Sequence, residues 1–314
     1  MAIHLRAPLL LAGLAAAASV AGCGRSGPAP LAAGGSSGGS GQARFEVVAA
    51  ENFWGGIAGQ LAGAKATVRS IVIDPNGDPH SYQPSAQDAR TMANASVAIV
   101  NGVGYDSWAQ QLLQASPAAG REVLNVGDLL GLGAGANPHR WYFPADVRTV
   151  ARRIVADYER LDPSDTAYFA QRERAFEVHG LARYDRLRAE IRGRYAGVPV
   201  GYSESIFQGL GEDLGLRLMT PYSFAKAISE GTDVTAHDKE AVDAQAQSRQ
   251  IKVWIYNSQN VTPDVQRIEE IARQRHIPIA TVTETLTPAS ASFEQWQDAE
   301  LEGLLRALHE ATGR

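Results

Sequence analysis

Cysteine is nearly absent from the chain. Its 314 residues include only Cys23, which excludes an internal disulfide and a metal site built from cysteines. Clusters of Lys and Arg are absent too, the net charge is −5, and the isoelectric point is about 5.8. An acidic surface repels the phosphates of DNA and RNA. The composition therefore argues against a nucleic-acid partner.

Segments long and apolar enough to cross a bilayer are also lacking. Ala7–Ala21 is rich in Ala and Leu but is too short to span a membrane. It ends at Val20-Ala21-Gly22-Cys23, which resembles a bacterial lipobox, where a signal peptidase cuts before a Cys that is then lipidated. An ordinary secretory signal with an incidental Cys is the alternative.

The lipobox interpretation makes residues 1–22 a signal peptide and residues 23–43 a tether that begins with the lipidated Cys23. Gly24–Gln42 is rich in Gly, Ser, Ala and Pro and has no apolar period, as flexible tethers do. Stable anchoring takes more than one acyl chain, and bacterial lipoproteins typically carry two or three. We therefore expect a lipid-anchored protein on the extracytoplasmic face of the cell membrane, in the periplasm or at the cell surface.

After residue 43 the chain alternates between strand-like and helix-like segments. Strands are expected at Arg44–Ala50, Ala66–Ile73, Ala95–Asn101, Glu122–Val126, Val198–Tyr202, Arg217–Thr220, Val253–Asn257 and Pro278–Thr283. Helices are expected at Asn52–Leu61, Ala86–Ala93, Trp108–Gln114, Ala145–Tyr158, Ser205–Leu214, Asp238–Gln247, Pro263–Arg275 and Phe293–Thr312. This alternation is typical of βαβ units with mainly parallel sheets, so we predict an α/β fold in two halves, residues 44–162 and 195–314.

Residues 163–194 are expected to join the two halves as one long helix. Asp162-Pro163-Ser164-Asp165 is a helix-start signal. From Thr166 to Arg194 there is no Pro, and apolar and aromatic residues recur every three or four positions, as they do on one face of a helix.

Two histidines lie in matching local sequences. Asp78-Pro79-His80-Ser81-Tyr82 and Asn137-Pro138-His139-Arg140-Trp141 both read Pro-His-x-aromatic, with a second Pro shortly downstream and a helix after it. His80 also follows an expected strand, at the edge where open α/β sheets bind ligands. Either histidine alone reads as an inert loop residue, and chance duplication is the alternative. Together they indicate two imidazoles aimed at one point, and imidazole suits Zn, Mn, Fe and Cu.

Two acidic residues occupy comparable places in the second half. Glu204 follows the strand Val198–Tyr202, and Glu284 follows the strand Pro278–Thr283. For either carboxylate alone, the alternative is a helix-start residue favoured by the helix dipole. Glu230 and Asp233 lie in a polar turn before a helix, and we interpret them as caps.

The paired histidine motifs, together with Asn101-Gly102, Trp108 and Pro144, resemble the metal-binding lipoproteins of zinc and manganese ABC importers. The resemblance covers roughly Arg44 to Leu305. It implies two Rossmann-like lobes with parallel sheets, joined by one long rigid linking helix, with the metal site in the cleft between the lobes. It also implies a monomer that is not an enzyme and that delivers a bare ion to a membrane permease driven by a cytoplasmic ATPase subunit.

The resemblance further implies a ligand set. His80 and His139 match the two histidine ligands of the first lobe, Glu204 matches the third ligand, and Glu284 stands where the family usually has Asp. The chain departs from the family at Tyr256-Asn257 as well, where an acidic residue is common. The expected cargo is one divalent ion, Zn²⁺ or Mn²⁺. Two carboxylates give a ligand set of hard oxygen atoms, which suits Mn²⁺. Zn²⁺ nevertheless binds such sites more tightly, so the choice between the two ions stays open.

Two other functions are weighed against transport. A secreted zinc metallohydrolase could use the same two histidines and two carboxylates with an open coordination position, but the chain has no His-Glu-x-x-His motif and no clear acid left as general base. A metal-chelate (siderophore) binding protein would need an aromatic and basic cleft rather than paired Pro-His turns. An additional adhesin role leaves no signal in the sequence.

The remaining histidines and the nearby aromatic residues are expected to lie outside the ligand set. These are His4, His179, His237, His276 and His309, together with Tyr82, Trp141 and Trp54, which are expected to pack beside the site.

Overall fold

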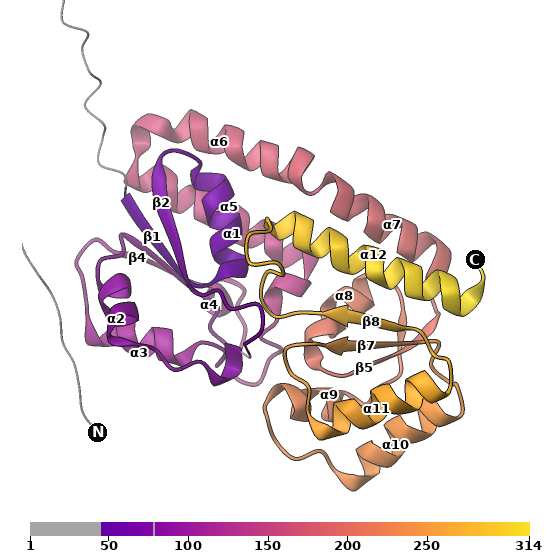
Figure 1. The fold of residues 1–314 in the computed structure, drawn as a ribbon. Helices are drawn as coiled ribbons and strands as arrows, with labels where there is room; N and C mark the ends of the chain where they lie inside the picture. Colours follow the sequence, from indigo (N-terminus) through magenta and orange to yellow (C-terminus); the bar gives the residue numbers. More distant parts are fainter. Residues whose placement is uncertain (1–44, 78) are drawn as a thin grey trace, which may run out of the picture. The chain divides into compact units, whose positions relative to one another are not determined.

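A computed structural model describes residues 45–77 and 79–314 (Figure 1). The signal peptide, the lipidated Cys23 and the tether predicted for residues 1–43 lie outside this part of the chain, and so does Asp78. None of the helices described is at once long and apolar enough to pass through a membrane.

The first lobe is a parallel sheet covered by helices. Its strands lie in the order β2-β1-β3-β4, and every pair is parallel. The buried positions of β1 and β3 are almost all Val, Ile or Ala, as expected where both faces of a parallel sheet are covered. The elements are β1 Phe45–Glu51, α1 Asn52–Ala62, β2 Ala66–Val72, α2 Ala86–Ala93, β3 Val97–Val100, α3 Ser107–Ala115, β4 Glu122–Asn125, α4 Val126–Leu129 and α5 Pro144–Leu161.

The second lobe repeats this plan. Its strands lie in the order β6-β5-β7-β8, again all parallel. The elements are β5 Pro199–Tyr202, α8 Gln208–Asp213, β6 Arg217–Leu218, α9 Tyr222–Ser229, α10 Ala236–Gln247, β7 Val253–Asn257, α11 Pro263–Gln274, β8 Ile279–Val282 and α12 Phe293–Thr312. The predicted fold class, two parallel α/β lobes joined by a long helix, is confirmed.

The linking segment is helical from Pro163 to Tyr195 but is not one uniform α-helix. A 3-10 turn at Pro163–Asp165 leads into α6 (Thr166–Ala175), a π-helical segment at Phe176–Gly180 and α7 (Ala182–Tyr195). The backbone N–H of Leu181 donates to the carbonyl O of Phe176, five residues back, which is the π pattern. In Figure 1 α6 lies over α1 and α5 of the first lobe, and α7 lies along α12 of the second.

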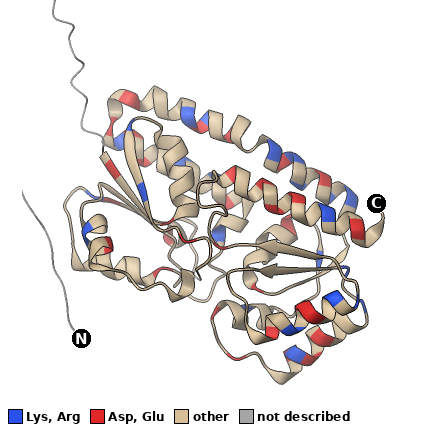
Figure 2. Ribbon diagram, in the orientation of Figure 1, with Lys and Arg blue, Asp and Glu red and all other residues tan. Residues whose placement is uncertain are grey.

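Charged residues of both signs are interspersed along α6, α7 and α12 (Figure 2). Arg183 of α7 pairs with Glu302 of α12, and Arg188 of α7 pairs with Asp213 of α8 at 2.6 Å. Exposed ion pairs such as Arg183–Glu302 contribute little energy each, about 0–1 kcal/mol. The apolar face of α7 is buried against the second lobe. Its residues Leu187 and Ile191 belong to a core that extends continuously into both sheets.

Two helices and one cap differ from the sequence prediction. The sequence did not predict α4, which has four residues, or α9, which has eight. Four residues are too few for a helical period to emerge. Of the two residues interpreted as caps, Glu230 is one, because it is the C-cap of α9. Asp233 is not the cap of α10: Thr235 is, and its side chain accepts from the backbone N–H of Asp238.

Candidate metal centre

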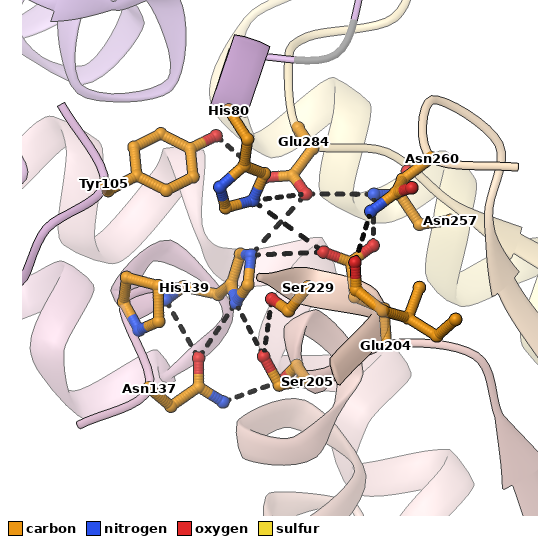
Figure 3. Close-up of polar contacts among 12 residues, drawn as sticks. His80, Tyr105, Asn137, His139, Glu204, Ser205, Ser229, Asn257, Asn260 and Glu284 are labelled. Carbon is orange, nitrogen blue, oxygen red and sulfur yellow. Dashed lines mark hydrogen bonds and ion pairs between the residues drawn. The ribbon is translucent and has the colours of Figure 1, made fainter. Parts of the chain in front are cut away.

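Each of the four predicted ligands follows the carboxyl end of a parallel strand. His80 lies in the loop after β2, and His139 lies in the loop that follows β4 and the short helix α4. Glu204 comes two residues after β5, and Glu284 comes two residues after β8. Because the two sheets point these ends toward each other, residues up to 204 positions apart converge (Figure 3). One potential ligand atom from each residue lies within 4.8 Å of the other three.

The distances between these atoms describe a compact cage. Nε2 of His80 lies 3.8 Å from Oε1 of Glu204 and 3.5 Å from Oε1 of Glu284. Nε2 of His139 lies 3.7 Å and 3.5 Å from the same two oxygens. A regular tetrahedron with such edges has its centre about 2.1–2.3 Å from each corner, close to the length of Zn–N and Zn–O bonds. The cage therefore fits one small divalent cation.

The cage is buried and has unsatisfied atoms facing inward. The side chains of His139, Glu204 and Glu284 are 0% exposed, and that of His80 is 23% exposed. Among the described residues, Nε2 of His139 and Oε1 of Glu204 have no hydrogen-bond partner. Buried polar atoms without partners are costly, so their convergence indicates that a further group completes them.

Asn137 fixes the tautomer of His139. The backbone N–H of His139 donates to Oδ1 of Asn137 at 3.0 Å, and Nδ2 of Asn137 donates to the carbonyl O of Ser205 at 2.7 Å. These two bonds orient the amide, so its Oδ1 accepts from Nδ1–H of the imidazole at 2.9 Å. The lone pair of the ring is then on Nε2, which faces the cage, as metal ligation requires.

A second chain of hydrogen bonds positions the Pro138–His139 turn. Nε1 of Trp54 donates to Oδ1 of Asn101 at 3.0 Å, and Nδ2 of Asn101 donates to the carbonyl O of Pro138 at 2.9 Å. The ring of Trp141 lies 5.3 Å from that of His139. Trp54 and Trp141 thus support the cage from the first lobe, whereas Tyr82 packs on Trp108.

The two carboxylates each direct one oxygen into the cage and have the other held from outside. Nδ2 of Asn257, at the end of β7, donates to Oε2 of Glu204 at 2.7 Å and also to Oε1 of Glu284 at 2.9 Å. The hydroxyl of Tyr105, from the first lobe, donates to Oε2 of Glu284 at 2.7 Å. Gln259 holds the Glu284 segment, because its Oε1 accepts from the backbone N–H of Thr285 at 3.0 Å.

Burial and the charges of neighbouring side chains set the pKa values in the cage. It raises the pKa of Glu204 to about 8, and the negative charge of Glu284 adds to the rise. Burial also lowers the pKa of His139, although Glu284 acts in the opposite direction. For Glu284 burial acts upward, but the imidazoles of His139 and His80 outweigh it and hold its pKa well below the usual range. Near neutral pH and without a cation, these shifts favour a proton on Glu204 and ionisation of Glu284.

A cavity of about 490 Å³ leads to the cage between the lobes. His80 and Asn137 line it on the side of the first lobe, and Ser205 and Ser229 line it on the side of the second. The wall also includes Lys226 and the exposed ring of Tyr222. The partly exposed His80 is therefore the member of the cage nearest to solvent.

Two residues that contact the carboxylates or their segment were not expected from the sequence, Tyr105 and Gln259. A third, Asn257, was noted only as a departure from the family. Asn257 ends a predicted strand, so its position at the ligand edge was the available signal. Tyr105 and Gln259 lie in loops with no motif. His179, His237, His276 and His309 are exposed and lie outside the cage, while His4 lies outside the described residues.

A model of the protein family described as the periplasmic zinc-uptake complex component A matches residues 47–307. Among curated relatives, a manganese-binding lipoprotein of Halalkalibacterium halodurans is 27% identical over 180 residues, covering 54% of this chain and 58% of the relative. The zinc-binding protein TroA of Treponema pallidum is 24% identical and is aligned over 65% of this chain and 67% of its own. The chain spans a little more than half the length of the first relatives it matches.

Solved structures share the fold. The Mn-bound periplasmic metal-binding protein of Candidatus Liberibacter asiaticus is 18% identical, with a TM-score of 0.71 over 84% of this chain and 100% of that one. The solute-binding protein FpvC of Pseudomonas aeruginosa, solved with Mn²⁺, is 20% identical, with a TM-score of 0.67 over 85% of this chain and 99% of that one.

Proposed function

Because the chain belongs to the family of periplasmic zinc-uptake components, we propose that it is the extracytoplasmic solute-binding protein of an ABC importer for a divalent transition metal. The ion, Zn²⁺ or Mn²⁺, is captured between the two lobes by His80, His139, Glu204 and Glu284. It is then passed to a membrane permease driven by an ATPase subunit. Relatives named for manganese and for zinc support this class of cargo.

The observation that carries the proposal is the cage of four buried nitrogen and oxygen atoms. Two carboxylates and two neutral imidazoles bring a charge of −2 when both carboxylates are ionised, which balances a divalent cation in a site where an unbalanced charge is very unfavourable. Imidazole and carboxylate are also the ligands that borderline and hard divalent metals prefer.

The sequence supports a place for this capture outside the cytoplasmic membrane. The lipobox at Cys23 and the Gly/Ser-rich segment of residues 23–43 favour a lipid anchor and a tether that let the lobes reach a permease in the same membrane. The anchor remains part of the proposal, and globomycin-sensitive processing with a Cys23→Ala variant as control tests it.

Hydrolysis is the rival use of the same residues. A catalytic zinc site keeps an open position for water beside three protein ligands. Here four protein atoms surround the centre, three of them on fully buried side chains. That arrangement favours holding an ion over activating water.

The test is the metal content of the domain Gln42–Arg314, which forms one compact unit. We expect about one equivalent of Zn²⁺ or Mn²⁺ after loading and dialysis, and loss of most of it in His80→Ala and Glu204→Ala. His179→Ala, on the exposed side of the linking helix, is the matched control. If neither site variant binds less metal than the control, the ligand assignment is wrong.

A further inference from the structure

The two carboxylates of the cage are each restricted to one oxygen. Oε1 of Glu204 and Oε1 of Glu284 face the imidazoles, at 3.5–3.8 Å from the two Nε2 atoms. The other oxygen of Glu204 is held by Asn257, and the other oxygen of Glu284 by Tyr105, both at 2.7 Å. Asn257 also donates to Oε1 of Glu284 at 2.9 Å, so it orients both carboxylates. Figure 3 shows these two donors on opposite sides of the cage, one from each lobe.

Both donors are themselves fixed. Asn257 is 0% exposed, its Oδ1 accepts from the backbone N–H of Gln259 at 3.0 Å, and its own backbone N–H donates to Oγ of Ser203 at 3.0 Å. Its amide is therefore oriented with the NH₂ group toward the two carboxylates. The ring of Tyr105 is 6% exposed and lies 5.1 Å from that of Trp141.

We propose that Asn257 is a specificity-determining residue, which by holding Oε2 of Glu204 limits the site to four ligand atoms and so favours Zn²⁺ over Mn²⁺. This inference rests on the proposed metal-binding function and deepens it. Zinc is bound in proteins by four ligands in a tetrahedron, whereas Mn²⁺ is found with six mainly oxygen ligands. A carboxylate that offers both oxygens raises the coordination number toward the one that manganese needs.

Asn257 suits this role because it is neutral and a donor. An Asp at this position has the same shape but only accepts hydrogen bonds when ionised, and it adds a third negative charge beside Glu204 and Glu284. It would repel Oε2 of Glu204 rather than hold it. The neutral amide therefore fixes the carboxylate geometry without changing the charge of the cage.

The experiment compares the full chain with Asn257→Ala, with Asn260→Ala as the matched control. Asn260 lies three residues further along and donates to the carbonyl O of Ile228 instead. Zn²⁺ and Mn²⁺ affinities are measured by competition titration, and Co²⁺ is bound as a spectroscopic probe. Four-coordinate Co²⁺ absorbs visible light strongly, and six-coordinate Co²⁺ absorbs it weakly.

We expect intense Co²⁺ bands in the wild type and in Asn260→Ala, and weakened bands in Asn257→Ala. The Zn²⁺ affinity of Asn257→Ala should fall about 10- to 100-fold, as is typical when a partner of a metal ligand is removed, while Mn²⁺ affinity changes less. The ratio of Zn²⁺ to Mn²⁺ affinity should therefore fall.

Tyr105→Phe provides a second variant, because it frees Oε2 of Glu284 from the other lobe and predicts the same direction of change. If Asn257→Ala fails to fold, the Zn²⁺-to-Mn²⁺ affinity ratio and the Co²⁺ bands of Tyr105→Phe test whether holding the outer oxygen of a carboxylate favours Zn²⁺. An unchanged affinity ratio with unchanged Co²⁺ bands, or weak bands already in the wild type, overturns the inference and leaves the proposed function intact. A wild type that binds none of the three ions instead overturns the proposed function.

Discussion

Asn137 joins the chemistry of His139 to the second lobe. Its Oδ1 accepts from both the backbone N–H and Nδ1–H of His139, and its Nδ2 donates to the carbonyl O of Ser205 and to Oε1 of Gln208. The bonds of Oδ1 select the tautomer, and those of Nδ2 cross between the lobes. A substitution that keeps the acceptor for His139 but removes the donor to the second lobe distinguishes these two roles.

We predict that Asn137→Ala lowers metal affinity about 10- to 100-fold, because the imidazole loses the acceptor that keeps its proton on Nδ1. Asn137→Asp keeps that acceptor while losing the amide donor to Ser205, and should recover most of the affinity. Isothermal titration with Zn²⁺ measures both. Equal losses in the two variants would show that the contact between the lobes matters more than the tautomer.

The raised pKa of Glu204, about 8, predicts how binding depends on pH. Below pH 8 the free site holds a proton on this carboxyl, and an incoming cation must displace it. Affinity should therefore rise by up to about tenfold per pH unit from pH 6 to 8 and flatten above pH 8, with close to one proton released at pH 7. Titrations in buffers of different ionisation enthalpy count that proton. Zero release at pH 7 would contradict the assignment.

Single residues also show where sequence reasoning stops. His80 and His139 lie in matching local motifs, and Glu204 and Glu284 follow predicted strands, so all four were candidates before the structure, and their ligand role remains a prediction. The donors Asn257 and Tyr105 act on carboxylates 53 and 179 positions away. These contacts depend on how distant parts of the chain pack together, and a local sequence pattern carries no information about that packing.

At the scale of elements, the alternation of strands and helices predicted both sheets because each strand is a short apolar run between turn residues. The linking helix was predicted as uniform, and its π-helical segment at Phe176–Gly180 was not. A π-helical turn contains about one more residue than an α-helical turn. Over five residues this hardly shifts the spacing of the apolar side chains, so the sequence pattern does not distinguish the two helices.

Helix α8 packs closely against the first lobe at Gly209. A Cβ added there would lie 2.5 Å from the ring of Phe143, the residue before α5. We therefore predict that Gly209→Ala destabilises the domain by about 1–3 kcal/mol, the usual effect of overpacking. Chemical denaturation of the domain without metal measures the change.

Gly193→Ala is the matched control. Gly193 lies in α7 with no atom within 4 Å of an added Cβ, so Ala should stabilise that helix by about 0.5–1 kcal/mol. Opposite signs for the two glycines are the expected outcome. A neutral Gly209→Ala would mean that Phe143 moves aside and that α8 does not depend on this contact.

At the scale of the whole molecule, an ion held by both lobes should stabilise the folded domain. At a free metal concentration of 100 times the dissociation constant the gain is about 2.7 kcal/mol, which for a domain of this size raises Tm by roughly 5 °C. Differential scanning fluorimetry with and without Zn²⁺ measures this. Glu284→Gln should lose most of the rise, and the exposed Glu190→Gln should keep it. A rise of equal size in both variants would place the ion elsewhere.

Of the four proposed ligands, two come from each lobe. Each lobe alone therefore offers two of the four proposed ligand atoms, and all four can bind one ion only while the two pairs share one centre. If the two lobes move apart by about 1–2 Å, the ion keeps only the two ligands of one lobe. It then loses the gain in affinity that comes from being bound by both pairs at once. If a permease separates the lobes when it binds this protein, it would then need no competing ligand to take the ion, because the separation itself weakens binding of the ion.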